Sequence, residues 1–285
     1  MEQPSADPVI DVVVPAWNSA DTVGRTIDSV LAQDFGAFRL IVADDGSTDT
    51  TIDVVRAYDD ERILLVEATH AGVCATRNRG AAAGNSPLLV FLDADDEALP
   101  GWLGKLAGEP DTPLTRCGAT IRTGVASSRI EPGEGPLLAG IFAVRRDLFE
   151  SLGGYDESLG FSENTDLGYR INRVLAASGS RAHVVDELLV RIHRDDAPRI
   201  IRYRREIQRD AAEHLLRAHT DLMTASEIGR HSAVAGVHNL ALGEPARARP
   251  QLRTAVQQHP RDWHYRLRLA QTYLPKRTSG FLFRH

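Results

Sequence analysis

The chain has 285 residues, of which 42% are hydrophobic and 25% charged, and its formal net charge at pH 7 is −6. This length is enough for one large domain or for a domain with an appendage, and the negative charge argues against nucleic-acid binding, because no basic surplus exists to neutralise phosphates. No apolar run approaches the roughly 20 residues that span a bilayer, and neither a secretory signal nor a disulfide framework is present, so we expect a cytoplasmic protein.

The first third of the chain alternates strand-like and helix-like segments. Residues 9–17 form a β-branched run that Pro15 is expected to end, and the segment 18–21 supplies cap residues for the helix that follows. Three more strand patterns follow, separated by helical patterns, at residues 38–43, 62–68 and 88–92. This alternation predicts an α/β domain with a mainly parallel, Rossmann-like sheet and helices on both faces.

Unusual residues follow three of these strands. They are Pro15-Ala16-Trp17-Asn18, Asp44-Asp45-Gly46-Ser47 and Asp93-Ala94-Asp95-Asp96. Ligands bind such sheets outside the carboxyl ends of the strands, so the sequence predicts a binding site at this edge. Taken singly, each group has a simpler interpretation as a turn or helix cap, which we expect to hold for Asp44 and Asp49.

The rest of the chain changes character twice. Residues 118–138 are rich in Gly, Ser, Thr and Pro and predict a mobile loop at 132–136. A strand, a helix, a glycine-rich turn and a longer helix follow, and from residue 198 the pattern is wholly helical. A hairpin around Gly243-Glu244-Pro245 is similar to a tetratricopeptide unit.

These patterns predict four parts of the chain. A flexible N-terminus (1–8) precedes the α/β domain (9–197). A small all-α appendage that offers a surface for protein contacts (198–275) and a tail (276–285) follow it.

Six sequence blocks occur in an order that resembles one known family. They read VVVPAWNSADTVGRTIDSVLAQDF, VADDGSTDTT, GVCATRNRGAAA, FLDADD, GGYDESL and SENTDLGYR. Together they resemble the family 2 glycosyltransferases, which have the GT-A fold, over about two-thirds of the chain. The resemblance implies an inverting, metal-dependent, hexosyltransferase-like enzyme that moves a sugar from a nucleotide-diphosphate donor to an acceptor hydroxyl.

The resemblance leaves the substrates partly open. UDP is the default donor nucleotide, with GDP and dTDP as alternatives. A glycan, a lipid-linked molecule or a small molecule are all candidate acceptors, in the synthesis of cell-envelope polysaccharide, glycolipid or another glycoconjugate.

The resemblance assigns the acidic strand end to a metal site. Asp95 should be a direct ligand of Mn²⁺ or Mg²⁺, and Asp93, with Ala94 between them, should contact the ribose or the metal shell. The two-residue period of a strand would turn both carboxylates toward one ion and Asp96 away from it, and hard oxygen ligands suit these cations. His193 matches a position near the diphosphate or metal, although a lone histidine is more often structural.

Further donor-binding residues follow from the same resemblance. Asp45 should accept a hydrogen bond from the nucleobase imide. Pro15 and Trp17, with Asn18 beside them, should line the base and ribose. Arg77 should lie near the nucleotide and the base-binding aspartate.

The acceptor side departs from the family pattern. Transfer needs a general base, which in this family is the aspartate of a Glu-Asp pair. Here the pair reads Glu163-Asn164, and an amide cannot accept a proton at neutral pH. Either Glu163 or Asp166 is then the base, with Glu163 preferred, or the enzyme is impaired. Gly154 and Tyr155 match the family's acceptor-side loop.

Two other hypotheses compete with an active transferase. The helical appendage and the amide at Asn164 would also suit a nucleotide-binding adaptor protein that no longer transfers sugar. The basic segment 200–209 would suit peripheral contact with the inner face of a membrane, or simply a solvated helix. A nucleotidyltransferase is disfavoured because PAWNSADT is not a glycine-rich phosphate loop.

Overall fold

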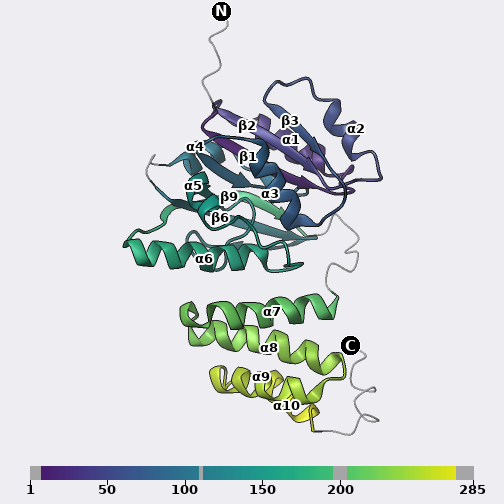
Figure 1. Cartoon of the computed structure of the whole chain (residues 1–285), viewed down its shortest axis with the longest axis vertical. Coiled ribbons are helices and arrows are strands. Elements are labelled where there is room, and N and C mark those ends of the chain that lie inside the picture. The colour runs from purple at the N-terminus through teal and green to yellow at the C-terminus, as the bar shows by residue number, and fades with distance from the viewer. Residues whose placement is uncertain (1–7, 109–111, 195–203, 274–285) are drawn as a thin grey trace, which may run out of the picture. The chain divides into compact units, whose positions relative to one another are not determined.

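The computed structural model describes residues 8–108, 112–194 and 204–273, and its contacts divide the chain into two units. The α/β unit comprises residues 1–158 and 163–198, and the helical unit comprises residues 159–162 and 199–285 (Figure 1). The predicted flexible N-terminus, except its last residue, lies outside the described residues. So do the predicted tail and the start of the basic segment 200–209.

The first four strands of the α/β unit are parallel, in the order β3-β2-β1-β4. This half of the sheet confirms the alternation predicted from the sequence. Its strands are β1 (Ile10–Ala16), β2 (Phe38–Asp44), β3 (Ile63–Glu67) and β4 (Leu88–Phe91), and the connecting helices are α1 (Val23–Leu31), α2 (Thr51–Arg56) and α3 (Val73–Ala83).

Beyond β4 the nine-stranded sheet is mixed, in the order β4-β8-β6-β9-β5, and β7 pairs with β6. Only β6 and β9 are parallel in this half. The strands are β5 (Glu97–Ala98), β6 (Leu114–Thr123), β7 (Ala126–Ile130), β8 (Phe142–Arg145) and β9 (His183–His193). The helices are α4 (Trp102–Ala107), α5 (Arg146–Ser151) and α6 (Glu163–Ser178).

Helices cover both faces of the parallel strands. One face buries Val12 and Val14 against α1 and α4, where the Trp102 indole is fully buried and donates to the Gly140 carbonyl at 2.7 Å. On the other face α3 approaches so closely that a Cβ on Gly80 would lie 2.5 Å from Val13. Strands β1, β2 and β4 are therefore buried on both sides, as their largely apolar sequences predicted, whereas β3 at the end of the sheet is partly exposed.

Two local predictions at the start of the chain were wrong. Pro15 lies inside β1, opposite Ala43 of β2, instead of ending the strand. The Val13 carbonyl accepts a hydrogen bond on the β4 side of β1, and the backbone of Pro15, two residues further on, faces that same side. Because β4 has ended there, the missing N–H of Pro15 leaves no hydrogen bond of the sheet unmade. The segment 18–21 does not cap α1 either; Thr22 holds the cap position without a side-chain hydrogen bond.

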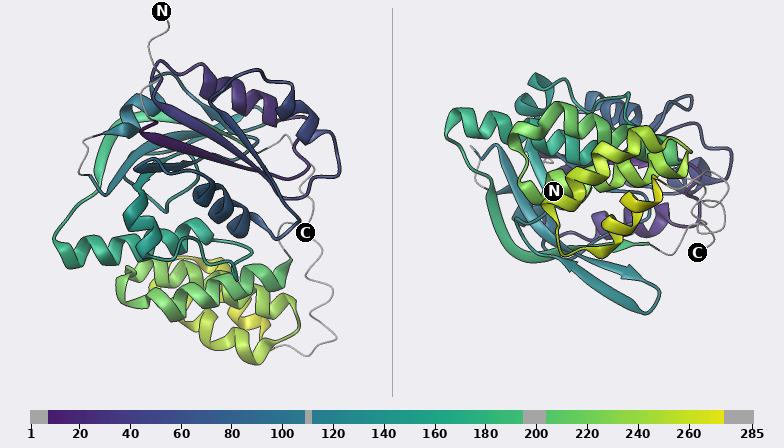
Figure 2. Two further views of the ribbon diagram at one scale, coloured as in Figure 1. Left: turned by 45° about the horizontal axis from the view of Figure 1, so that its top comes forward. Right: turned by 90° about the horizontal axis from the view of Figure 1, so that it is seen from below.

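The loop predicted at residues 132–136 is irregular in the structure, but the hairpin that precedes it was not predicted. Residues 114–130 form an antiparallel hairpin in which Thr123 pairs with Ala126, so only two residues make the turn (Figure 2). Gly124 has a φ of 58°, which is the left-handed conformation that such turns require. The predicted loop follows the hairpin. The guanidinium group of Arg116, on β6, donates to the carbonyl groups of residues 133–135 and holds this loop against the strand.

The helical unit packs its helices as neighbours in chain order, as Figures 1 and 2 show for α7 to α10. They are α7 (Arg205–His219), the 3₁₀ turn η1 (Thr220–Leu222), α8 (Ala225–Ala241), α9 (Pro245–Gln258) and α10 (Trp263–Gln271). Thr224 and Glu227 form a capping box at the start of α8. Gly243 has a φ of 79° and ends it. The helical hairpin predicted around residues 243–245 is thus confirmed.

Two further observations bear on the sequence predictions. Among the described residues, no helix combines the length and the apolar character needed to cross a bilayer. Cys74 and Cys117 are both buried free thiols, and burial raises the pKa of each to about 12.

A buried ion pair between Arg146 and Asp11 anchors the amino end of β1. Its loss should lower the stability of the α/β unit. Arg146 donates at 2.6 Å to Asp11, which is fully buried, and also holds the Ser86 and Ala81 carbonyls. We expect Arg146→Met to lower the free energy of unfolding by about 3–5 kcal/mol, because it leaves the Asp11 carboxylate without its cation. Denaturant titration followed by circular dichroism measures this change.

Arg145→Met is the matched control, because Arg145 pairs with the exposed Asp147. A surface pair of this kind contributes about 0–1 kcal/mol. Equal losses in the two variants would contradict the assignment of the Arg146 pair as the anchor.

Candidate active site

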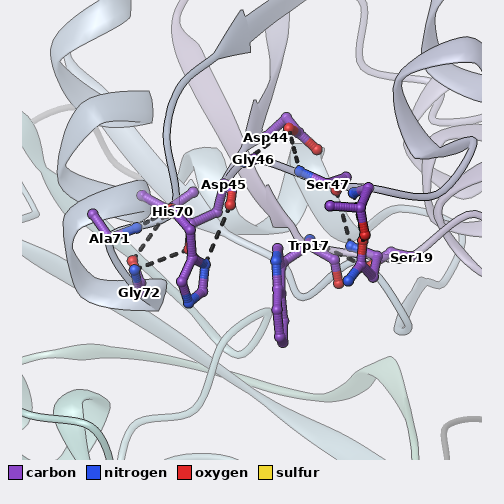
Figure 3. Close-up of polar contacts among 12 residues, drawn as sticks. Trp17, Ser19, Asp44, Asp45, Gly46, Ser47, His70, Ala71 and Gly72 are labelled. Carbon is purple, nitrogen blue, oxygen red and sulfur yellow. Dashed lines mark hydrogen bonds and ion pairs between the residues drawn. The ribbon is translucent and has the colours of Figure 1, made fainter.

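The loops after β1 and β2 are tied together by polar contacts. Asn18, with a φ of 48°, donates its N–H to the Ser47 hydroxyl at 2.9 Å and accepts from the Thr48 N–H at 2.8 Å. Asp44 accepts from the N–H groups of Gly46 and Ser47 at 3.0 and 2.9 Å, which confirms its expected role in a turn (Figure 3). These contacts fix the edge of the sheet where the candidate donor site lies.

Asp49 lies in the turn before α2, as expected, but Thr50 holds the cap position of that helix. Its carboxylate accepts from the Ala20 and Thr51 N–H groups at 3.2 and 3.0 Å, and these hydrogen bonds lower its pKa although burial opposes them. The Asp49 carboxylate therefore helps to shape this loop.

The Asp45 carboxylate connects the β2 loop to the start of α3. It is buried, and its two oxygens accept from the N–H groups of Ala71 and Gly72 at 2.8 and 2.9 Å. His70 Nδ1 lies 2.8 Å from the same carboxylate. The residue predicted to recognise a nucleobase is thus held in place by the loop between β3 and α3.

Trp17 and His70 form an aromatic pair at this edge that the sequence analysis missed. Their ring centroids lie 4.7 Å apart with an interplanar angle of 28°, and Trp17 is 46% exposed (Figure 3). The signal was available, because β3 also ends at this edge and the loop that follows it contains His70. The rings offer a flat surface on which a base can stack.

The acidic group after β4 forms a cluster through a turn. The Asp96 N–H donates to the Asp93 carbonyl at 3.0 Å, and one carboxylate oxygen from each of Asp93, Asp95 and Asp96 lies within 4.8 Å of the others. The strand-period argument was therefore wrong: β4 has already ended, and the turn brings Asp96 into the group. Burial, and then the charges of Asp93 and Asp95, raise the pKa of Asp96 well above its ordinary value. Three hard oxygen donors that repel one another fit a divalent cation.

Residues of α1 and β9 donate hydrogen bonds that hold the acidic turn in place. Arg25 donates to the Asp95 carbonyl at 2.6 Å, and the His193 N–H donates to the Asp96 carboxylate at 3.0 Å. The His193 ring lies against Glu97, with Nε2 and Oε1 3.2 Å apart. His193 therefore reaches the cluster through its backbone, and its predicted role in the metal shell stays a prediction. The Ala94 side chain is buried in the core.

Arg77 links the acidic turn to the start of α6. Its side chain is 2% exposed and donates to Asp93 at 2.6 Å and to Glu163 at 2.7 Å. Burial by itself lowers the pKa of Arg77, but the charges of these carboxylates outweigh it and raise the pKa well above the ordinary value. Arg77 was predicted to lie near the nucleotide and Asp45, and its described contacts place it between Asp93 and Glu163.

The predicted acceptor-side residues are connected to one another. Tyr155 is buried, and its hydroxyl donates to Asn164 at 2.8 Å. The Asn164 amide donates in turn to Glu163 at 3.2 Å. Gly154 has a φ of 71°, and a Cβ there would lie 2.6 Å from Asn78, so the turn before Tyr155 requires glycine.

Asp166, the other candidate base, has different partners. It pairs with Arg170 at 2.7 Å, one turn further along α6. Arg170 also donates to the carbonyls of Leu152 and Gly154. Within the α/β unit Asp166 is thus part of the support of the glycine turn, whereas Glu163 is joined to the acidic cluster through Arg77.

Known proteins resemble this chain in sequence and in fold. Residues 11–160, more than half of the chain, match the family described as Glycosyl transferase family 2. Over 101 residues, or 34% of the chain, the sequence is 42% identical to the succinoglycan biosynthesis protein ExoU of Rhizobium meliloti (strain 1021). That segment makes up 29% of ExoU, so the chain spans less than a third of this curated relative.

Solved structures share the fold. The S. aureus TarS fragment 1–349 in complex with UDP-GlcNAc superposes with a TM-score of 0.63 at 17% identity, covering 93% of this chain and 89% of that one. Mannosyltransferase PcManGT from Pyrobaculum calidifontis, in complex with GDP-Man and Mn²⁺, gives a TM-score of 0.59 at 17% identity, covering 94% and 85%. These likenesses confirm the predicted GT-A-type fold with a helical C-terminal region. With its match over residues 11–160, the chain belongs to the Glycosyl transferase family 2.

Proposed function

We propose that this chain is an inverting glycosyltransferase that moves a sugar from a nucleotide-diphosphate donor, UDP-sugar in the first instance, to a hydroxyl of a growing glycan. One observation carries the proposal: Arg77 joins Asp93 of the acidic turn to Glu163. In this proposal Arg77 would link a donor-binding group, Asp93, to the proton acceptor, Glu163. The name of ExoU refers to succinoglycan biosynthesis, and the two superposed structures hold UDP-GlcNAc and GDP-Man, which supports a nucleotide-sugar donor.

The donor half of the proposed site consists of a base-binding edge and an acidic turn. The exposed ring of Trp17 would provide a stacking surface, and Asp45, which contacts the neighbouring His70 ring, would be a hydrogen-bond acceptor. Asp95 and Asp93, with Asp96 beside them, would hold a divalent cation, Mn²⁺ or Mg²⁺. When bound, such a cation neutralises the charge of the departing diphosphate.

The acceptor half depends on Glu163. As the first residue of α6 it lies at a helix N-terminus, where the helix dipole stabilises the ionised form of a carboxylate. Arg77 holds it beside the acidic turn, so an acceptor hydroxyl placed against the donor sugar would meet this carboxylate first. Asp166, which is paired with Arg170, takes no part in the proposed transfer.

Nucleotide binding should stabilise the folded protein and depend on a divalent cation. We expect one nucleoside diphosphate, UDP before GDP or dTDP, to raise the melting temperature by several degrees with Mn²⁺ and by less with EDTA. At a hundredfold excess over Kd, binding adds about 2.7 kcal/mol of stability. Differential scanning fluorimetry measures the shift. Asp95→Ala should abolish the Mn²⁺-dependent part, and Asp59→Ala, at an exposed position before β3, should not.

If none of these nucleotides changed the melting temperature of the wild-type protein, the proposed donor class would be wrong. Binding without turnover with any acceptor would instead favour the adaptor hypothesis. Both the thermal shift and the turnover can be measured on one protein preparation, so the two outcomes can be distinguished.

Removing the proposed base should affect the chemical step and leave the donor bound. We expect Glu163→Gln to lower kcat by about 10²–10⁴-fold, the usual contribution of a general base, with the nucleotide-induced thermal shift unchanged. Asp166→Asn is the comparison variant, and its kcat should fall much less. A radiolabelled-sugar transfer assay measures both. The opposite order of the two losses would identify Asp166 as the base.

A further inference from the structure

The Glu163 carboxylate is held through only one of its two oxygens. Arg77 Nη1 and Asn164 Nδ2 both donate to Oε1, at 2.7 and 3.2 Å. Among the described residues, no hydrogen bond reaches Oε2, and the side chain is 15% exposed. One oxygen is therefore anchored, and the other is available to a ligand.

The orientation of the Asn164 amide is set by a buried phenol. Burial raises the pKa of Tyr155, so its hydroxyl keeps its proton and donates to Asn164 Oδ1 at 2.8 Å. The opposite orientation of the amide would turn Oδ1 toward the Glu163 carboxylate and Nδ2 toward the phenol. Only the observed orientation gives the carboxylate a donor.

Tyr155 supports both donors to Glu163. Besides binding Asn164, its ring lies under the Arg77 guanidinium group, whose carbon is 5.2 Å from the ring centroid. Phe91 and Phe149 pack edge-on against the same ring, with centroid distances of 5.1 and 5.7 Å. A rigid aromatic cluster thus fixes the two groups that fix Glu163 Oε1.

We propose that Asn164 and Tyr155 are positioning residues, which hold Glu163 through Oε1 so that Oε2 takes the proton of the acceptor hydroxyl. This inference rests on the proposed function. In the transfer, the hydroxyl oxygen forms the new bond to the anomeric carbon as its proton passes to Oε2. The bond from that carbon to the diphosphate breaks, and the nucleoside diphosphate leaves with the electron pair.

The amide at Asn164 is then part of a working site. Where the family has a carboxylate as base, this chain has a donor that orients the preceding glutamate. A carboxylate at position 164 would place a second negative charge about where Nδ2 now lies, 3.2 Å from Glu163 Oε1. Restoring the family residue should therefore lower activity in this chain.

The test compares Asn164→Asp and Tyr155→Phe with the wild-type protein. We expect Asn164→Asp to lower kcat by about 10- to 100-fold, the loss that corresponds to a hydrogen bond to a charged group. The KM for the donor and the nucleotide-induced thermal shift should stay unchanged. The described side-chain hydrogen bonds of Asn164 and Tyr155 join them to each other and to Glu163, and not to Trp17, Asp45 or the acidic turn. Tyr155→Phe should lower kcat by a smaller factor, since Arg77 still holds Oε1.

Two substitutions elsewhere in the α/β unit serve as matched controls. Tyr58→Phe removes a phenol that donates to the Gly24 carbonyl and Asp28, and Asn85→Asp introduces a carboxylate at an exposed position. Both should leave kcat and KM unchanged.

The double variant Glu163→Gln/Asn164→Asp decides between the two possible bases. If Glu163 is the base, this variant is inactive. An increase of kcat in Asn164→Asp, or transfer by the double variant at the rate of Asn164→Asp, would overturn the proposal and assign the base to position 164.

A stability measurement tests the contact without turnover. Asn164→Asp should lower the melting temperature because two carboxylates meet, and adding Glu163→Gln should restore most of it. Failure of Glu163→Gln to relieve the loss would overturn the proposed contact even if no acceptor were found. Absence of any nucleotide-induced shift in the wild-type protein would instead count against the proposed function.

Discussion

The candidate site depends on a single buried cation, the guanidinium group of Arg77. Removing one partner from a buried ion pair costs several kcal/mol, and here two carboxylates, Asp93 and Glu163, neutralise the charge from two sides. Asp93 follows β4 and Glu163 begins α6, 86 residues beyond Arg77 in sequence. The acidic turn and the start of α6 therefore form one unit: a displacement of either would leave charge unpaired in the interior.

The parallel half of the fold could be predicted because its signals are local. Apolar runs such as residues 12–14 and 88–92 mark buried strands, and acidic residues such as Asp93 mark the ends of those strands. The residues after these strands meet at one edge, as predicted, because parallel strands place their carboxyl ends together. The hairpin over residues 114–130 was missed because its strands are rich in small polar residues, and its glycine was counted as a sign of a loop.

The contacts of individual side chains could not be predicted from the sequence. Asp96 joins the acidic cluster because a turn follows β4, a fact that depends on one i to i+3 hydrogen bond. His70 meets Trp17 only because two loops from separate strands end at the same place. The sequence shows that Asn164 departs from the family pattern, but not that its amide lies between a phenol and a carboxylate. In each case the deciding contact joins groups whose distance is set by tertiary structure.

The exposed aromatic pair at the sheet edge has a practical consequence. The three tryptophans of the chain lie in different surroundings: Trp17 is half exposed at the candidate donor site, Trp102 is fully buried in the α/β core, and Trp263 on α10 is 61% exposed. Each therefore samples a different part of the molecule. If a base stacks on Trp17 as proposed, the environment of that indole alone would change, and its fluorescence would report site occupancy. With Trp17 as the single remaining tryptophan, donor affinity becomes measurable by emission, without labels or a coupled assay.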